Sequence, residues 1–142
     1  MNRIRYQSLK PWKYRLFDDY SVKIPILPDK EIVTQYLRLA VNGQLTISKG
    51  YAWDGPSGPT VDTKTFMRGS LVHDALYQFM GMGKLSWSLR DQADRLLQQM
   101  CREDGMSKLR AWWVYHGVSK GYRLVKPFRK SHEKLTRVLE AP

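Results

Sequence analysis

The sequence predicts an α+β fold, in which an N-terminal antiparallel β-sheet or hairpin is followed by about three helices and a basic C-terminal tail. Two observations carry this prediction. Before residue 60, aromatic and β-branched residues alternate with polar ones, as in strands. After residue 64, apolar residues recur every three or four positions, as in helices. We expect a single domain over 1–142, with 1–60 mainly β, 64–125 mainly α and 126–142 forming the tail.

The β half is predicted from its turn residues as well as from alternation. Two strands are expected around Asn42-Gly43, within the run YLRLAVNGQLTISKGYAW. Asn-Gly is the strongest short hairpin signal, because a type I′ turn needs two positive φ angles. Pro25 and Pro28 predict that the strand before them lies at the edge of a sheet, since proline cannot donate a backbone hydrogen bond.

The helical half is divided by glycine and serine. The first helix is expected to end at Gly81-Met82-Gly83, because glycine readily adopts the left-handed conformation found there. The second is expected to begin at Ser88 and the third to be capped by Ser107. Within the tail, helical spacing predicts a short docking helix containing Leu135, Val138 and Leu139.

Composition and charge limit the class of protein. Hydrophobic residues make up 42% of the 142 residues, which is typical of a globular chain. The single Cys101 excludes an internal disulfide and is expected to be a packed core residue. No apolar run is long enough to span a membrane, and the N-terminus lacks the apolar segment of a signal peptide.

The net charge of +11 is concentrated at the two ends of the chain. Such ends can attract nucleic acid, an anionic membrane surface or an acidic host protein, although they can also be no more than a solvated surface. If nucleic acid is the partner, Tyr122 and Phe128 are candidates for stacking on bases. The residues expected to meet an anionic partner are Lys126, Arg129, Lys130 and Lys134.

The residues that carry chemistry lie between Gly50 and Asp94. A loop rich in glycine and proline contains Asp54 and Asp62, and the following helix carries His73 next to Asp74. Carboxylates in such a loop suit a hard divalent cation, Ca²⁺ above all, and histidine exchanges protons near neutral pH. Asp74, Asp54 and Asp62 are therefore the expected metal ligands.

Helix geometry predicts a second contact of the histidine. His73 and Tyr77 are one turn apart on the same face. The connection to the next helix is short, so the two helices should be antiparallel neighbours. His73 lies about two turns before the end of the first helix, and Asp94 lies about two turns after the start of the second, so the two residues should be at the same level. We therefore expect a His73–Asp94 hydrogen bond that fixes the imidazole tautomer, with His73, Asp94 and Tyr77 as candidate catalytic residues.

These motifs resemble those of a family of small phage-encoded domains of unknown function. They are Trp53-Asp54-Gly55-x-Ser57, His73-Asp74-x-x-Tyr77 and Arg90-x-x-x-Asp94, and the resemblance covers residues ~45 to ~121. It implies a bacteriophage or prophage origin and a fold of sheet followed by helices. With no apolar span and no signal peptide, we expect a location in the host cytoplasm or the virion. The resemblance implies no established chemistry.

The His-Asp-x-x-Tyr helix is also similar to that of secretory phospholipases. In those enzymes a histidine activates water, an aspartate on the following antiparallel helix orients it, and the adjacent aspartate holds Ca²⁺ with loop carbonyls. The similarity implies these roles for His73, Asp94 and Asp74. The disulfides of those enzymes are absent here, and the loop is longer.

Two other interpretations remain open from the sequence. The same residues can form a structural polar network that locks helix to loop, in a non-enzymatic virion component or a protein that binds and inhibits a host factor. Alternatively, the basic C-terminus can make the chain a nucleic-acid-binding protein.

Overall fold

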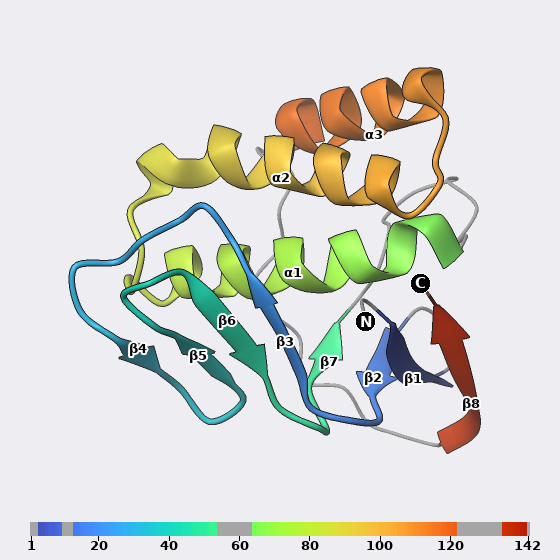
Figure 1. Cartoon of the computed structure of the whole chain (residues 1–142), viewed down its shortest axis with the longest axis horizontal. Coiled ribbons are helices and arrows are strands. Elements are labelled where there is room, and N and C mark those ends of the chain that lie inside the picture. The colour runs from blue at the N-terminus through green and yellow to red at the C-terminus, as the bar shows by residue number, and fades with distance from the viewer. Residues whose placement is uncertain (1–2, 10–12, 54–63, 122–134, 142) are drawn as a thin grey trace.

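The fold is α+β, as predicted, with antiparallel sheets followed by three helices (Figure 1). The computed structural model describes residues 3–9, 13–53, 64–121 and 135–141. The helical segments are α1 (Lys64–Gly81), the short 3₁₀ turn η1 (Trp87–Leu89), α2 (Arg90–Glu103) and α3 (Lys108–Gly121). In this described part of the chain, no helix is long and apolar enough to cross a membrane.

The strands form two four-stranded antiparallel sheets. One has the order β7-β2-β1-β8 and the other the order β3-β6-β5-β4. The strand β3 is at an edge and ends two residues before Pro25, which agrees with the position expected from the prolines. The strands are β1 (Ile4–Leu9), β2 (Lys13–Leu16), β3 (Tyr20–Lys23), β4 (Ile32–Val33), β5 (Leu37–Leu39), β6 (Gln44–Ile47), β7 (Ala52–Trp53) and β8 (Leu135–Ala141).

The hairpin at Asn42-Gly43 is confirmed, but its predicted turn type is wrong. Gly43 has a φ of 89°, whereas no non-glycine residue in the described chain has a positive φ, so Asn42 does not adopt the type I′ conformation. The amide of Gly43 donates to the carbonyl of Ala40, and the side chain of Asn42 accepts from the amide of Gln44. The connection is therefore an ordinary turn followed by a left-handed glycine, which also permits a hairpin.

The expected docking helix at the C-terminus is wrong, because residues 135–141 form the strand β8. This strand pairs with β1 along the edge of the first sheet, with Ile4 opposite Ala141 and Gln7 opposite Val138 (Figure 1). Backbone pairing with a distant strand overrides the helical spacing of the leucines and valine.

The three helices lie in successive layers over the sheets, with α1 nearest the strands and α3 farthest from them (Figure 1). The first helix ends near Gly83, which has a φ of 72°, as predicted. The second helical segment begins one residue earlier than expected, at Trp87, and its cap is Ser86 rather than Ser88. As predicted, Ser107 accepts a hydrogen bond from the amide of Arg110 at the start of α3.

The core lies on both sides of α1. One cluster joins the sheets to α1, and a smaller one, which includes Phe66 and Leu97, joins α1, α2 and α3. Cys101 belongs to the smaller cluster, and burial raises the pKa of its thiol to about 12, which agrees with its predicted role as a packed residue.

Candidate functional site

The site lies where α1 and α2 pack as antiparallel neighbours. Their close approach depends on Gly69, because a Cβ at this position would lie 2.9 Å from Cδ1 of Leu97. One turn further along α1, His73 meets Asp94 of α2 at the same level of the interface. The equal helical depths inferred from the sequence are therefore present in the fold.

The predicted hydrogen bond between His73 and Asp94 is confirmed. The distance from Nε2 of His73 to Oδ1 of Asp94 is 2.7 Å, and both side chains are buried. A carboxylate oxygen can only accept, so Nε2 carries the hydrogen and Nδ1 is left with a lone pair when the ring is neutral. Asp94 therefore selects the tautomer in which Nδ1 can take up a proton.

Asp94 of α2 receives hydrogen bonds from both of the other helices, α1 and α3. Besides His73, the hydroxyl of Tyr77 donates to Oδ1 at 2.6 Å, and the hydroxyl of Ser119 in α3 donates to Oδ2 at 3.3 Å. Arg90 holds the end of α3 in place by donating to the carbonyl of Ser119 at 3.0 Å. A buried carboxylate with several donors is fixed in position, as a residue that orients a catalytic histidine must be.

The other nitrogen of His73 faces Asp74. Nδ1 lies 3.9 Å from Oδ1 of Asp74, which is too far for a direct hydrogen bond. The side chain of Asp74 is 31% exposed, against 9% for His73, so this side of the imidazole is the one nearer to solvent. Burial opposes protonation of His73, but Asp74 and Asp94 outweigh it, and the pKa of the imidazole is raised above its usual value.

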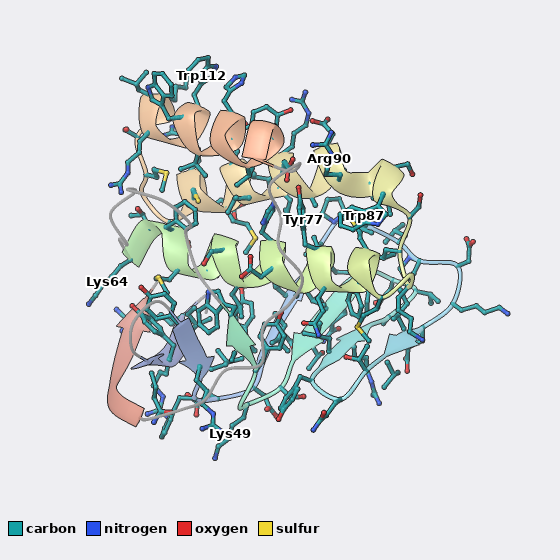
Figure 2. The ribbon with its side chains drawn as sticks, turned by 180° about the vertical axis from the view of Figure 1, so that it is seen from behind. Lys49, Lys64, Tyr77, Trp87, Arg90 and Trp112 are labelled. Carbon is teal, nitrogen blue, oxygen red and sulfur yellow. The ribbon has the colours of Figure 1, made fainter. Side chains whose placement is uncertain are left out.

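Two aromatic side chains, Tyr77 and Trp87, pack in sequence on one side of the His73 ring. The rings of His73 and Tyr77 lie 4.2 Å apart between their centroids, and Trp87 of η1 packs edge-on against Tyr77 at 5.8 Å (Figure 2). Trp87 is partly exposed. The imidazole therefore has an aromatic boundary on one side and the carboxylate of Asp74 on the other.

The predicted metal ligands are only partly described. Asp74 is beside His73 and partly exposed, and a carboxylate is an oxygen ligand that suits a hard cation. In the described ranges, no three His, Cys, Asp or Glu side chains form a group that could hold a metal ion. Asp54 and Asp62 lie outside the described residues, as do the predicted partner-binding residues Lys126, Arg129, Lys130 and Lys134 and the stacking candidates Tyr122 and Phe128.

Trp53, the first residue of the motif Trp53-Asp54-Gly55-x-Ser57, is a core residue. It is buried on β7 against Tyr6 and Tyr14, and its Nε1 donates to the hydroxyl of Ser70 at 3.0 Å. Its role is to fix the strand that leads toward α1. His116 packs its ring on Trp112 in α3 and makes no contact with the site around His73.

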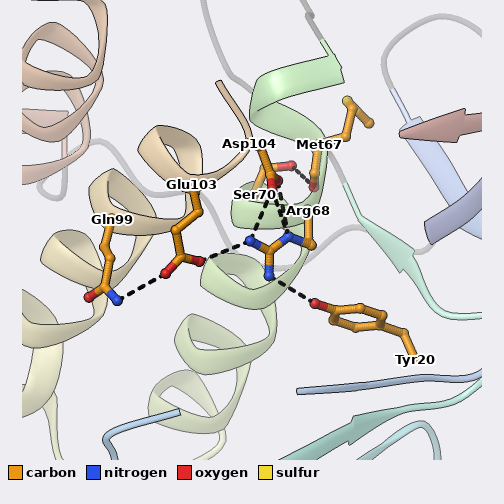
Figure 3. A network of polar contacts seen from close by, with 7 residues as sticks. All are labelled: Tyr20, Met67, Arg68, Ser70, Gln99, Glu103 and Asp104. Atoms are coloured by element: carbon orange, nitrogen blue, oxygen red, sulfur yellow. Dashed lines mark hydrogen bonds and ion pairs between the residues drawn. The ribbon is translucent and has the colours of Figure 1, made fainter. Parts of the chain in front are cut away.

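A second polar network, centred on Arg68, was missed from the sequence (Figure 3). This buried guanidinium donates to Asp104 at 3.0 Å, to Glu103 at 3.0 Å and to the hydroxyl of Tyr20 at 3.2 Å. Burial raises the pKa of Asp104 even though Arg68 opposes the rise. The one signal in the sequence was an arginine flanked by apolar residues, in the run FMRGSLV, because such a residue needs an acidic partner.

The network of Arg68 joins the end of α2 to α1 and to strand β3. The hydrogen-bond partners of Arg68 all belong to the protein itself. In the described residues, no buried side-chain nitrogen or oxygen lacks a hydrogen-bond partner. The Arg68 network is therefore a structural tie between the layers of the fold.

Comparison with known proteins identifies the family. No curated protein and no solved structure matches the chain. The model of a family described as "Protein of unknown function (DUF1353)" matches residues 33–118, which include the sheet β3-β6-β5-β4 in part, α1, α2 and most of α3. All of the residues that contact Asp94, apart from Ser119, lie in this range. The resemblance to a family of unknown function is thus confirmed, and the chain belongs to the DUF1353 family.

Proposed function

We propose that this chain is a hydrolase in which His73 is the general base that activates a water molecule. The observation that supports this most directly is the 2.7 Å hydrogen bond from Nε2 of His73 to buried Asp94. It leaves Nδ1 as the basic nitrogen, on the more exposed side of the ring next to Asp74. A base held in one tautomer by a buried carboxylate is the arrangement that water activation requires.

The proposed substrate class is a phospholipid ester, which rests on the similarity of the His-Asp-x-x-Tyr helix to secretory phospholipases. Nδ1 of His73 removes a proton from water while the water oxygen bonds to the ester carbonyl carbon. The bond from this carbon to the alcohol oxygen then breaks, and the protonated imidazole gives its proton to that oxygen. The products are a fatty acid and a lysophospholipid, and His73 returns to its neutral state.

Tyr77 and Asp94 are positioning residues in this proposal. Asp94 holds the ring by Nε2 and stabilises the imidazolium that forms during the reaction. Tyr77 donates to the same oxygen of Asp94 and covers the ring of His73, which restricts the rotation of both side chains. Neither residue exchanges a proton with the substrate.

We also propose that Asp74 holds a divalent cation, Ca²⁺ in the first place, together with Asp54 and Asp62 of the preceding loop. Such a cation would polarise the ester carbonyl. Binding can be measured without turnover, by calorimetric titration of Ca²⁺ into the wild type and into Asp74→Asn. Calcium binding that is weakened at least about tenfold in the variant supports the ligand role, and equal binding contradicts it.

The hydrolase proposal is tested by following fatty-acid release from phospholipid in mixed micelles with Ca²⁺. His73→Gln and Asp94→Asn should each lower kcat by about 10²–10⁴-fold, because a general base contributes a factor of this size. His116→Gln is the matched control, since it removes a histidine outside the site, and it should keep wild-type activity. No release by the folded wild type, or full activity in His73→Gln, would contradict the proposal and leave the network a structural one.

We further expect a phage or prophage origin, with a place in the host cytoplasm or the virion. This expectation rests on the resemblance of the three motifs to phage-encoded domains. The genes on either side of the coding sequence test it, since phage structural or lysis genes should surround it. A chromosomal setting without phage genes would contradict it.

A further inference from the structure

The outward face of α3 carries a continuous apolar surface. Leu109 is 69% exposed, Trp112 46% and Trp113 63%, and their spacing of three and four residues places them on one side of the helix. The opposite side of α3 is already buried against α2 through Ala111 and Val114. The helix is thus apolar on both faces, but only one of these faces packs against the rest of the described protein. We call the residues Leu109, Trp112 and Trp113 the Trp face.

The aromatic rings of the Trp face pack against one another. The indoles of Trp112 and Trp113 meet edge to face at 5.1 Å, and the ring of His116 lies 4.1 Å from that of Trp112. Figure 2 shows Trp112 at the outer edge of the molecule, on the helix farthest from the sheets. Large rings that already contact one another lose less conformational entropy on entering an interface than isolated side chains do.

Charge identifies the kind of partner that this face fits. The helix α3 contains Lys108, Arg110 and Lys120 and no acidic residue, and the chain carries a net charge of +11. A second copy of the chain would bring two strongly positive bodies together, which is unfavourable. A partner with negative charges at its surface and an apolar layer beneath them would bind both the cationic side chains and the aromatic rings.

We propose that the Trp face docks on the surface of an anionic phospholipid bilayer. Tryptophan is enriched at the boundary between headgroups and acyl chains, because its ring is largely apolar and its N–H remains hydrated. Leu109 would enter the acyl region beside the two indoles, and Lys108, which lies next to Leu109 and Trp112, would lie among anionic headgroups. The docking is peripheral and requires no hydrolytic activity.

The test uses the full chain and vesicles of ether-linked phospholipid, which has no ester bond to hydrolyse. Vesicles of phosphatidylcholine with 30 mol% phosphatidylglycerol are compared with pure phosphatidylcholine by cosedimentation. Tryptophan emission should shift to the blue on the anionic vesicles, and brominated lipid should quench it. Binding should be weaker on neutral vesicles and should fall as salt is raised from 50 to 200 mM.

The double variant Trp112→Ser/Trp113→Ser should bind the anionic vesicles at least about tenfold more weakly, since two large apolar rings are lost. Both rings are exposed, so circular dichroism should show an intact fold. Trp87→Ser is the matched control, because it removes a partly exposed tryptophan from another element, and it should bind like the wild type.

Three results would overturn the proposal. They are no binding to anionic vesicles, equal binding by the double variant, and binding of single-stranded DNA that depends on the Trp face while vesicles are ignored. His73→Gln should bind vesicles like the wild type. Failure of the hydrolase proposal, seen as absent turnover, is therefore distinguishable from failure of this one.

Discussion

Gly69 of α1 faces Leu97 of α2 so closely that the interface has no room for a methyl group on residue 69. His73 lies one turn further along α1 and donates to Asp94, which lies about one turn before Leu97 in α2. Since the two contacts are neighbours along the same pair of helices, the small residue sets the separation at which the hydrogen bond can form.

Gly69→Ala should destabilise the protein by about 1–2 kcal/mol, although alanine is the better helix former. The added Cβ would meet Leu97 at 2.9 Å and Sγ of Cys101 at 3.3 Å, and both neighbours are buried. Gly117→Ala is the matched control, because no atom lies within 4 Å of its Cβ position, and it should stabilise by about 0.5–1 kcal/mol. Urea unfolding measures both, and stabilisation by Gly69→Ala would contradict a tight helix contact.

His73 should titrate above its usual pKa of 6.5, because the carboxylates of Asp74 and Asp94 outweigh the effect of burial. Asp94→Asn should lower this pKa, since the neutral amide stabilises imidazolium less than a carboxylate does. Asp91→Asn, on the exposed side of the same helix, should leave the titration of His73 as in the wild type. Proton NMR of the imidazole follows all three proteins, and an unchanged titration in Asp94→Asn would tell against the pairing.

The raised pKa of His73 also predicts a pH dependence of stability. The folded state binds the proton more tightly than the unfolded state, so protonation of His73 favours folding. This stabilising effect is fully present below the unfolded pKa of about 6.5 and is lost as the pH rises through the folded pKa. The difference in unfolding free energy between the wild type and His73→Gln should therefore be larger at pH 6 than at pH 9. Hydrolysis, which needs the neutral base, should rise over the same interval.

Arg68→Met should be among the most destabilising single substitutions, at about 3–5 kcal/mol, because it leaves Asp104 almost fully buried without its cation. Arg95→Met breaks a pair with Asp91 in which both side chains are exposed, and it should change stability by less than about 1 kcal/mol. Thermal unfolding of the two variants makes the comparison. Equal effects would show that the network of Arg68 does not tie the layers together.

Deletion of residues 135–142 should lower the unfolding free energy by about 1 kcal/mol for each backbone hydrogen bond lost between β1 and β8. Simultaneous replacement of Lys126, Arg129, Lys130 and Lys134 by serine should leave the urea midpoint near that of the wild type. The replacement should nevertheless weaken any salt-dependent binding to an anionic partner. A deletion without effect on the midpoint would show that β8 adds nothing to the sheet.

The sequence located the elements whose signals are local. The hairpin at Asn42-Gly43 and the end of α1 near Gly83 depend on backbone conformations that few residues tolerate. The His73–Asp94 hydrogen bond was also predictable, because two helices joined by a short connection must be antiparallel and equal depths must then meet.

Features that depend on distant pairing were not predictable in the same way. Leu135, Val138 and Leu139 have the spacing of a helical face, and only the distant strand β1 makes this segment a strand. Arg68 draws its partners from the end of α2 and from β3, so no fixed spacing along the chain connects them. Local patterns of residues carry no information about either pairing.

The pairing of β1 with β8 has a consequence for synthesis on the ribosome. β1 is synthesised before β8, which covers its edge, and all the other elements described lie between them in the sequence. Until residues 135–141 have been added, one row of amide and carbonyl groups on β1 is open to any other extended chain nearby. The sheet that contains β1 therefore cannot be completed until β8 has been synthesised. Until then, the exposed edge of β1 makes the nascent chain prone to aggregation.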